Sequence, residues 1–122
     1  MKNLDYDVII IGAGPGGIFS AYELATQNPN LRIGVFEAGN PLAKRKCPID
    51  GVHVKTCCHC KTCAIMSGFG GAGAFSDGKY NITNDFGGTL YEYIGKKEAT
   101  ELMQYVDHIK VTHGGENCKL YS

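Results

Sequence analysis

Glycines near the start of the chain follow the spacing Gly12-x-Gly14-x-x-Gly17, with Pro15 and Gly16 inside it. At this spacing the first glycine allows a tight turn, and the second lets a diphosphate approach main-chain N–H groups at the N-terminus of a helix. The third allows close packing of that helix on a strand. We therefore expect residues 12, 14, 15, 16 and 17 to form a loop that binds the diphosphate of a dinucleotide.

The segments around this loop are those that such a site needs. Residues 8–11 are all apolar and predict a buried parallel strand, residues 18–25 predict a helix, and residues 31–36 predict a second strand. Glu37 follows the second strand, 25 positions after Gly12, where a carboxylate accepts both ribose hydroxyls of the adenosine and repels a 2′-phosphate. This order predicts a Rossmann-type βαβ unit over residues 1–40. FAD and NAD both use it.

A second glycine run lies further along the chain, with five glycines in the eleven positions from 68 to 78. Such a run lets the backbone approach a flavin or a diphosphate closely, and we expect contacts from Gly70, Gly71, Gly73 and Ser76. A surface loop is the alternative. Arg45 lies eight residues after Glu37 and could reach the diphosphate, although an ordinary solvated basic run is equally compatible with the sequence.

Cysteines gather between these two glycine segments, at Cys57-x-x-Cys60-x-x-Cys63 and at Cys47, which precedes a proline. Four thiols at these spacings can converge on an iron–sulfur cluster or on a tetrahedral zinc ion. Reduced thiols without metal, some of them redox-active, are the other interpretation. Cys118 stands apart, and we expect it to be structural.

Composition narrows the class of protein. The chain has 122 residues, of which 43% are hydrophobic and 20% charged, with 12 basic and 12 acidic side chains. Balanced charge argues against a nucleic-acid surface, and no apolar run is long enough for a membrane span. The N-terminus has no apolar leader, so we expect a cytoplasmic protein with reduced cysteines.

The predicted organisation is an incomplete α/β domain. After the βαβ unit we expect a cysteine-rich loop over residues 41–66 and a glycine-rich loop over residues 67–88. Residues 89–122 form a helical segment, whose apolar spacing over 89–110 predicts one or two amphipathic helices broken near Gly95. Two parallel strands bury little surface, and we see no later apolar strand. We therefore expect the chain to be the N-terminal part of a larger FAD/NAD(P)-binding domain.

Taken together, the fingerprint with Glu37, the Arg45-x-Cys47-Pro pair, the cysteine triplet and the run from Gly70 to Lys79 resemble a family of bacterial and archaeal predicted FAD-dependent dehydrogenases. The resemblance covers nearly the whole chain, and members of that family are several times longer. The chain departs from this family at Tyr80, where family members carry leucine. The N-terminal position of the fingerprint and its Glu-x-Gly ending are also similar to flavoproteins. The resemblance thus favours FAD over NAD.

The function expected on these grounds is that of a flavin-dependent oxidoreductase, with a small-molecule redox substrate and NAD(P)H as a candidate electron donor. The sequence identifies no catalytic acid or base, because the four histidines lie in unrelated contexts. The competing class is a non-redox scaffold that holds FAD or a metal. Substrate and oligomeric state are not predicted.

Overall fold

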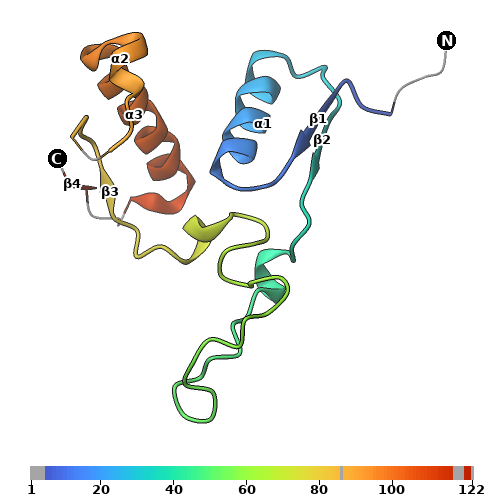
Figure 1. Ribbon diagram of the computed structural model, residues 1–122. Helices are drawn as coiled ribbons and strands as arrows, with labels where there is room; N and C mark the ends of the chain where they lie inside the picture. The colour runs from blue at the N-terminus through green and yellow to red at the C-terminus, as the bar shows by residue number, and fades with distance from the viewer. Residues whose placement is uncertain (1–4, 86, 117–119, 122) are drawn as a thin grey trace. The chain divides into compact units, whose positions relative to one another are not determined.

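The computed structural model describes residues 5–85, 87–116 and 120–121 as a mixed α/β chain (Figure 1). The chain divides into two compact units, Met1–Phe75 and Ser76–Ser122. The first unit holds the glycine fingerprint, the cysteines predicted to bind metal and most of the second glycine run. The candidate site is therefore built within the first unit.

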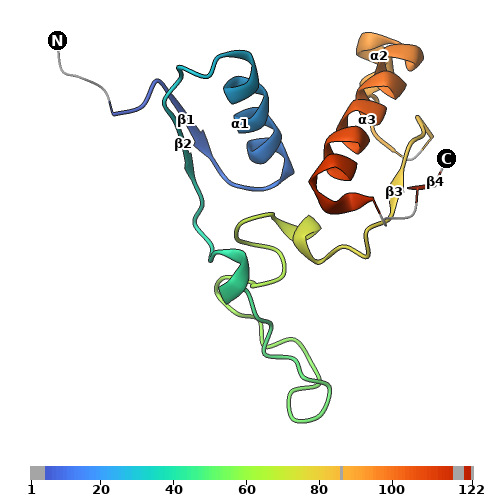
Figure 2. The same ribbon diagram turned by 180° about the vertical axis from the view of Figure 1, so that it is seen from behind.

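A parallel strand pair and one helix form the N-terminal part of the first unit. The strands are β1 (Val8–Ile11) and β2 (Ile33–Phe36), in register from Val8 opposite Ile33 to Ile11 opposite Phe36. The helix α1 (Pro15–Gln27) connects them and lies beside the pair in both views (Figures 1 and 2). The predicted strand, helix and strand are present as elements, but the first strand, expected to be buried, has Ile9 and Ile11 exposed.

The second strand is shorter than predicted, because neither of the two residues before Ile33 donates its main-chain N–H to a carbonyl of β1. Leu31 donates its main-chain N–H to the carbonyl of Asn28. The N–H of Arg32 goes to the Asp7 carboxylate at 2.9 Å. Because one donor closes the turn after α1 and the other bonds to a side chain, regular pairing begins only at Ile33.

One face of the strand pair is open. Ile9 and Ile11 alternate onto the same face as Phe36, the partner of Ile11, and their exposed fractions are 59%, 82% and 48%. The Tyr6 ring packs edge-on against Phe36, with 5.7 Å between ring centroids. Both aromatic rings crowd Gly34, where a Cβ would lie within 3.0 Å of each. Parallel sheets in α/β proteins are normally covered on both faces, so this apolar face is unusual for its class.

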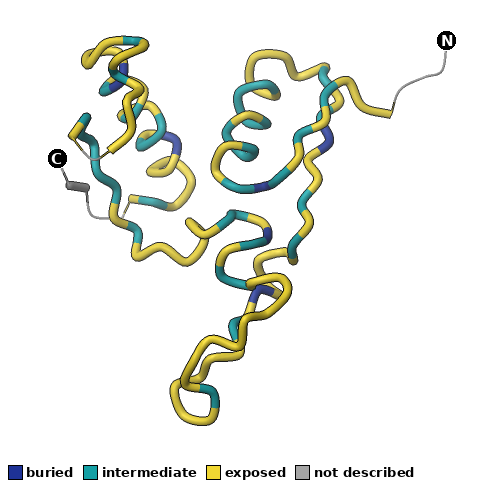
Figure 3. Tube along the Cα trace, viewed as in Figure 1, coloured by how far each residue is buried: buried dark blue, intermediate teal, exposed yellow. Residues whose placement is uncertain are grey.

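After β2 the first unit continues without long elements. It contains the short helical turns η1 (Leu42–Lys44) and η2 (Ala72–Phe75). Between them the cysteine-rich segment runs out and back as a loop, green in Figure 1, and Figure 3 shows that nearly all of it is exposed. The segment predicted as a loop over 41–66 contains η1, and that over 67–88 contains η2 and a two-residue strand at Tyr80–Asn81.

The second unit pairs two-residue strands, β3 (Tyr80–Asn81) and β4 (Leu120–Tyr121), in parallel. Between them come α2 (Leu90–Ile94), α3 (Lys96–Lys110) and a π-helical turn, η3 (Val111–Gly115). The break falls at Gly95, as predicted, where φ is +84°. Within α3, Ala99 and Ile109 are buried.

The helical segment predicted over 89–122 contains α2, α3 and η3 and, near its end, the strand β4. A two-residue strand such as β4 is too short to give an alternating pattern in the sequence. Cys118 lies outside the described residues. None of the helices that the structure describes is both long and apolar enough to cross a membrane.

Candidate functional site

The fold itself requires two of the fingerprint glycines. Gly12 has φ +97°, a conformation that L side chains rarely adopt, and its N–H donates to the carbonyl of Phe36 at 2.7 Å. At Gly17 a Cβ would overlap the carbonyl oxygen of Gly12. These two glycines therefore close the turn from β1 into α1 and let the helix approach it.

Two other glycines have no such explanation. Gly14 has φ −77° and Gly16 lies in the first turn of α1, so neither needs the conformational freedom of glycine. A Cβ built at either position would meet no atom within 4 Å. Because these two glycines have no side chains, the surface at the N-terminus of α1 is open. A phosphate group needs such a surface for close approach to the backbone.

The electrostatics of this helix end also suit an anion. The N-cap of α1 is Gly14, which has no side chain to accept the N–H groups of the first turn. Pro15 occupies the first helical position, where its missing N–H costs nothing. The N–H groups and the positive end of the helix dipole are thus not neutralised by an acidic side chain in the first turn.

Glu37 lies directly after β2 and holds the turn of the fingerprint. Its carboxylate accepts the N–H of Ala13 through Oε2 and the N–H of Gly39 through Oε1, both at 2.8 Å. The hydrogen bond from Ala13, and then that from Gly39, lower the pKa of Glu37 below its ordinary value of 4.5. A further main-chain hydrogen bond, from Gly68, also lowers this pKa. A carboxylate offers about four acceptor positions, so capacity remains for a ribose hydroxyl.

The second glycine run packs against the fingerprint. Gly70 donates its N–H to the carbonyl of Ala13 at 2.8 Å. A Cβ at Gly71, where φ is +59°, would lie 3.2 Å from the Cα of Gly14 and 3.3 Å from Cδ of Pro15. One at Gly73 would lie 3.9 Å from Cγ of Pro15. The structure thus brings together the two glycine segments that the sequence singled out separately.

A further glycine crossing supports this arrangement. A Cβ at Gly39 would lie 2.5 Å from the main-chain nitrogen of Gly68, so the two chain segments touch backbone to backbone. Nearby, Phe69 donates its N–H to the carbonyl of Asn40 at 3.1 Å. Sequence reasoning missed this contact. Gly39, which ends the Glu-x-Gly stretch, was the only sign in the sequence that another backbone segment lies against this turn.

Arg45 is buried, with 5% of its surface exposed, so it does not belong to a solvated basic run. Its guanidinium donates four hydrogen bonds to main-chain carbonyls of residues 64–71. These donors are already used within the protein. The predicted contact of Arg45 with a diphosphate is untested and stays a prediction.

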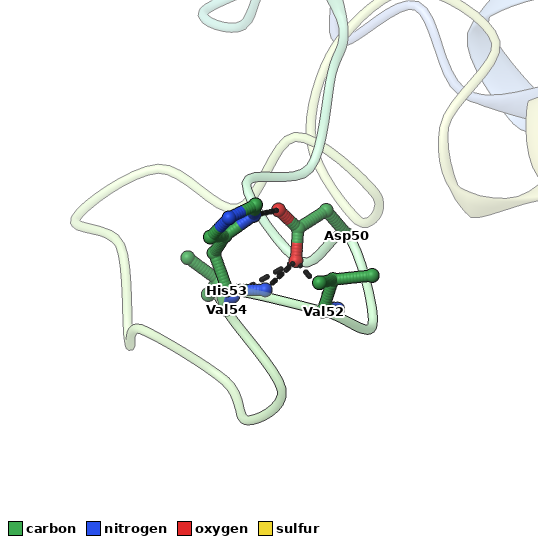
Figure 4. A network of polar contacts seen from close by, with 4 residues as sticks. All are labelled: Asp50, Val52, His53 and Val54. Carbon is green, nitrogen blue, oxygen red and sulfur yellow. Dashed lines mark hydrogen bonds and ion pairs between the residues drawn. The ribbon is translucent and has the colours of Figure 1, made fainter.

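The cysteine-rich loop begins with a tight turn made by Asp50 (Figure 4). One carboxylate oxygen of Asp50 accepts the N–H groups of Val52, His53 and Val54 at 2.8–2.9 Å, and the other contacts the His53 ring. The bonds from Val54 and then Val52 lower the pKa of Asp50 from 3.8 to about 2. This turn stabilises the start of the loop without involving a thiol.

The thiols of this loop are free. Cys57, Cys60 and Cys63 are exposed, as is Cys58, and Cys47 is half-buried. Over the described residues, no group of three or more His, Cys, Asp or Glu side chains is placed to hold a metal ion. The structure therefore does not gather the four predicted ligands, and the expectation of a cluster or zinc site has no support. Two-residue spacing permits convergence without requiring it.

Ser76 opens the second unit, where its hydroxyl accepts the N–H of Gly78 at 3.2 Å. Nearby, Lys79 forms an ion pair with Asp77 at 2.7 Å. The expected contact of Ser76 with a cofactor is untested and stays a prediction.

Comparisons with known proteins cover the N-terminal region. The Thi4 family profile matches residues 1–42. A thiamine thiazole synthase of Coprinopsis cinerea is 58% identical over 33 residues, which are 27% of this chain and 10% of the relative. The thiamine thiazole synthase of Yarrowia lipolytica is 50% identical over 38 residues, which are 31% of this chain and 12% of the relative. That of Phaeosphaeria nodorum is 54% identical over 33 residues, which are 27% of this chain and 10% of the relative. No solved structure matches.

The matched stretch thus spans about a tenth of the length of these relatives. The matches do not show the dehydrogenase family that the later motifs resemble. The family match takes in both glycine-fingerprint strands, α1 and Glu37, and it ends before Arg45 and the second glycine run. Over its first 42 residues, the chain is similar to the Thi4 family. The relatives that the chain matches are named as enzymes, thiamine thiazole synthases.

Proposed function

We propose that this chain binds FAD through the fingerprint loop and the second glycine segment. The observation that carries the proposal is the open surface at Gly14 and Gly16. The fold gives no reason for glycine at either position, whereas close approach of a diphosphate to the α1 N-terminus does. Glu37 supports the proposal by lying at the carboxyl end of β2, where parallel sheets bind their ligands.

In this proposal each group has a separate task. The N-terminus of α1 holds the diphosphate, and the Glu37 carboxylate binds the adenosine ribose while it fixes the Ala13 turn. Gly70, Gly71 and Gly73 line the site from the other side, because they already pack on the fingerprint loop. When bound, FAD supplies hydride or electron transfer, and the protein positions and tunes it.

We further propose that the whole protein is a flavin-dependent oxidoreductase. The resemblance of the run from Gly70 to Lys79 supports this reaction class. The match to the Thi4 family ends at residue 42, so it supports a shared nucleotide-binding segment rather than a shared reaction. Under this proposal, further strands and helices of a longer polypeptide cover the open face at Ile9 and Ile11 and contribute the substrate site.

The test uses the full-length protein, purified and reconstituted with FAD, NAD or NADP in parallel. We expect FAD to co-purify or to bind on reconstitution and give two visible absorption bands, which NADH or NADPH bleaches under anaerobic conditions. FAD that binds and is bleached by dithionite but by neither NADH nor NADPH would overturn the nicotinamide-dependent oxidoreductase and leave a non-redox scaffold. Binding of NAD without FAD, or of no dinucleotide, would overturn the FAD site itself.

A further inference from the structure

The guanidinium of Arg45 joins carbonyls from two parts of one loop. Nε donates at 2.8 Å, Nη2 at 2.6 Å, and Nη1 makes two bonds at 2.7 and 2.8 Å. In that order, the acceptors are the carbonyl oxygens of Ala64, Ile65, Phe69 and Gly71. The ring of Phe75 lies over the guanidinium, with its centroid 4.8 Å from Cζ. Arg45 therefore closes residues 64–75 around itself.

Only an arginine can make this set of contacts. A guanidinium carries five N–H donors in a planar fork, whereas the ammonium of lysine is a compact charge with three donors at one point. The packing around the side chain is equally close. A Cβ at Gly68 would lie 2.6 Å from Cδ of Arg45 and 2.6 Å from the carbonyl oxygen of Asn40. These four bonds are partly buried, so removing the fork would leave carbonyls that are partly shielded from water without their partner.

The bonds of Arg45 bracket the contact between the second glycine segment and the fingerprint. Arg45 holds the carbonyls of Phe69 and Gly71, and the residue between them, Gly70, donates to the carbonyl of Ala13. Gly71 in turn packs on Gly14. The side chain of Arg45, which residues 64–75 enclose, therefore fixes the position of the second glycine segment against the fingerprint loop.

We propose that Arg45 is a positioning residue for the nucleotide site, which sets the second glycine segment against the fingerprint loop so that both reach the same diphosphate. This inference rests on the proposed FAD site and deepens it. It assigns to Arg45 an effect on FAD affinity that acts through Gly70 and Gly71, without direct contact to the cofactor. The positive charge alone does not suffice.

The test compares R45K and R45Q with K46Q in the full-length protein. Lys46 is exposed and adjacent in sequence, so K46Q removes one positive charge without disturbing the carbonyl contacts. FAD dissociation constants are measured by quenching of flavin fluorescence, well below each variant's melting temperature, and amide exchange of Phe69, Gly70 and Gly71 is followed by mass spectrometry. We expect R45K and R45Q to weaken FAD binding about tenfold or more, a factor equal to about 1.4 kcal/mol. Amide exchange of Gly70 should accelerate to a similar extent, while K46Q matches the wild type.

A second variant keeps the test decisive if the Arg45 variants do not fold. In G71A the arginine stays in place, but the added methyl group meets the Cα of Gly14 and pushes the segment off the fingerprint. We expect the same loss of FAD affinity. Wild-type affinity in folded R45K, or in G71A, would overturn the positioning role alone. Absence of FAD binding in the wild type would overturn the proposed function and this inference together.

Discussion

Oε2 of the Glu37 carboxylate accepts the main-chain N–H of Ala13 at 2.8 Å, across 24 residues of sequence. This bond ties the end of β2 to the turn between β1 and α1. Ala13 is almost completely buried, and its carbonyl oxygen also accepts the N–H of Gly70. One residue of the fingerprint therefore receives both the acidic side chain and the second glycine segment.

Replacement of Glu37 by glutamine tests the role of this carboxylate. Glu37→Gln keeps one acceptor oxygen but loses the charge and the second oxygen, so it cannot hold Ala13, Gly39 and a ribose together. We expect FAD affinity to fall about tenfold, measured by fluorescence titration at pH 7. Glu101→Gln, at an exposed position of α3 with a weak ion pair, is the control and should bind FAD normally. Unchanged affinity in Glu37→Gln would remove this residue from the site.

Alanine substitutions at Gly16 and Gly17 can be compared for their effects on the free energy of unfolding, because the two glycines are adjacent but only Gly17 is closely packed. Gly17→Ala forces a methyl group into the Gly12 carbonyl, and we expect the free energy of unfolding to fall by about 2 kcal/mol or more. Gly16→Ala adds its methyl group in open space within a helix, so stability should stay within about 1 kcal/mol of wild type, on the favourable side. Urea denaturation without ligand measures both. Equal stability of the two variants would contradict the close packing at Gly17.

These two variants also separate stability from binding. Although Gly16→Ala is expected to fold well, its methyl group lies on the surface proposed for the diphosphate. FAD binding by Gly16→Ala should therefore be weaker than that of the wild type despite normal stability. Wild-type affinity would move the diphosphate away from this end of α1.

The Asp50 turn should titrate at an unusually low pH. Its folded pKa of about 2 lies below the ordinary 3.8, so its stabilising contribution is complete above about pH 3.8 and is lost as the pH falls through about 2. Amide resonances of Val52, His53 and Val54 should shift with a midpoint near pH 2. Asp50→Ala should abolish that titration and speed amide exchange of the same three residues. A midpoint near 3.8 would show that the carboxylate does not hold the turn.

Reactivity of the thiols decides the remaining cysteine question. In the native reduced protein, we expect maleimide to label quickly the four cysteines that are exposed in the described part of the chain. Cys47 should react more slowly, because it is half-buried. The exposed four are Cys57, Cys58, Cys60 and Cys63. Mass spectrometry of peptides after short labelling times gives the order. Protection of Cys57, Cys60 and Cys63 that a chelator removes would show that they hold metal after all.

Local pattern was enough to predict the elements of the fingerprint. The apolar run at Val8–Ile11, the spacing of the glycines and the break at Gly95 each depend on residues close in sequence. The chain gave no comparable sign of the Arg45 contacts, because their partners lie 19–26 residues away and are carbonyls, which every residue carries. Nor could cysteine spacing show whether the thiols converge, since that depends on the path of an exposed loop.

The contact between Gly70 and Ala13 also bears on how the protein is made. A ribosome completes residues 1–42, which carry both strands and α1, well before it reaches the segment that packs on the fingerprint loop. These residues also leave the exit tunnel first, so the nascent βαβ unit can form while the second wall of the proposed nucleotide site is still inside the tunnel. Productive capture of the cofactor is therefore expected only after residue 75 has emerged from the exit tunnel.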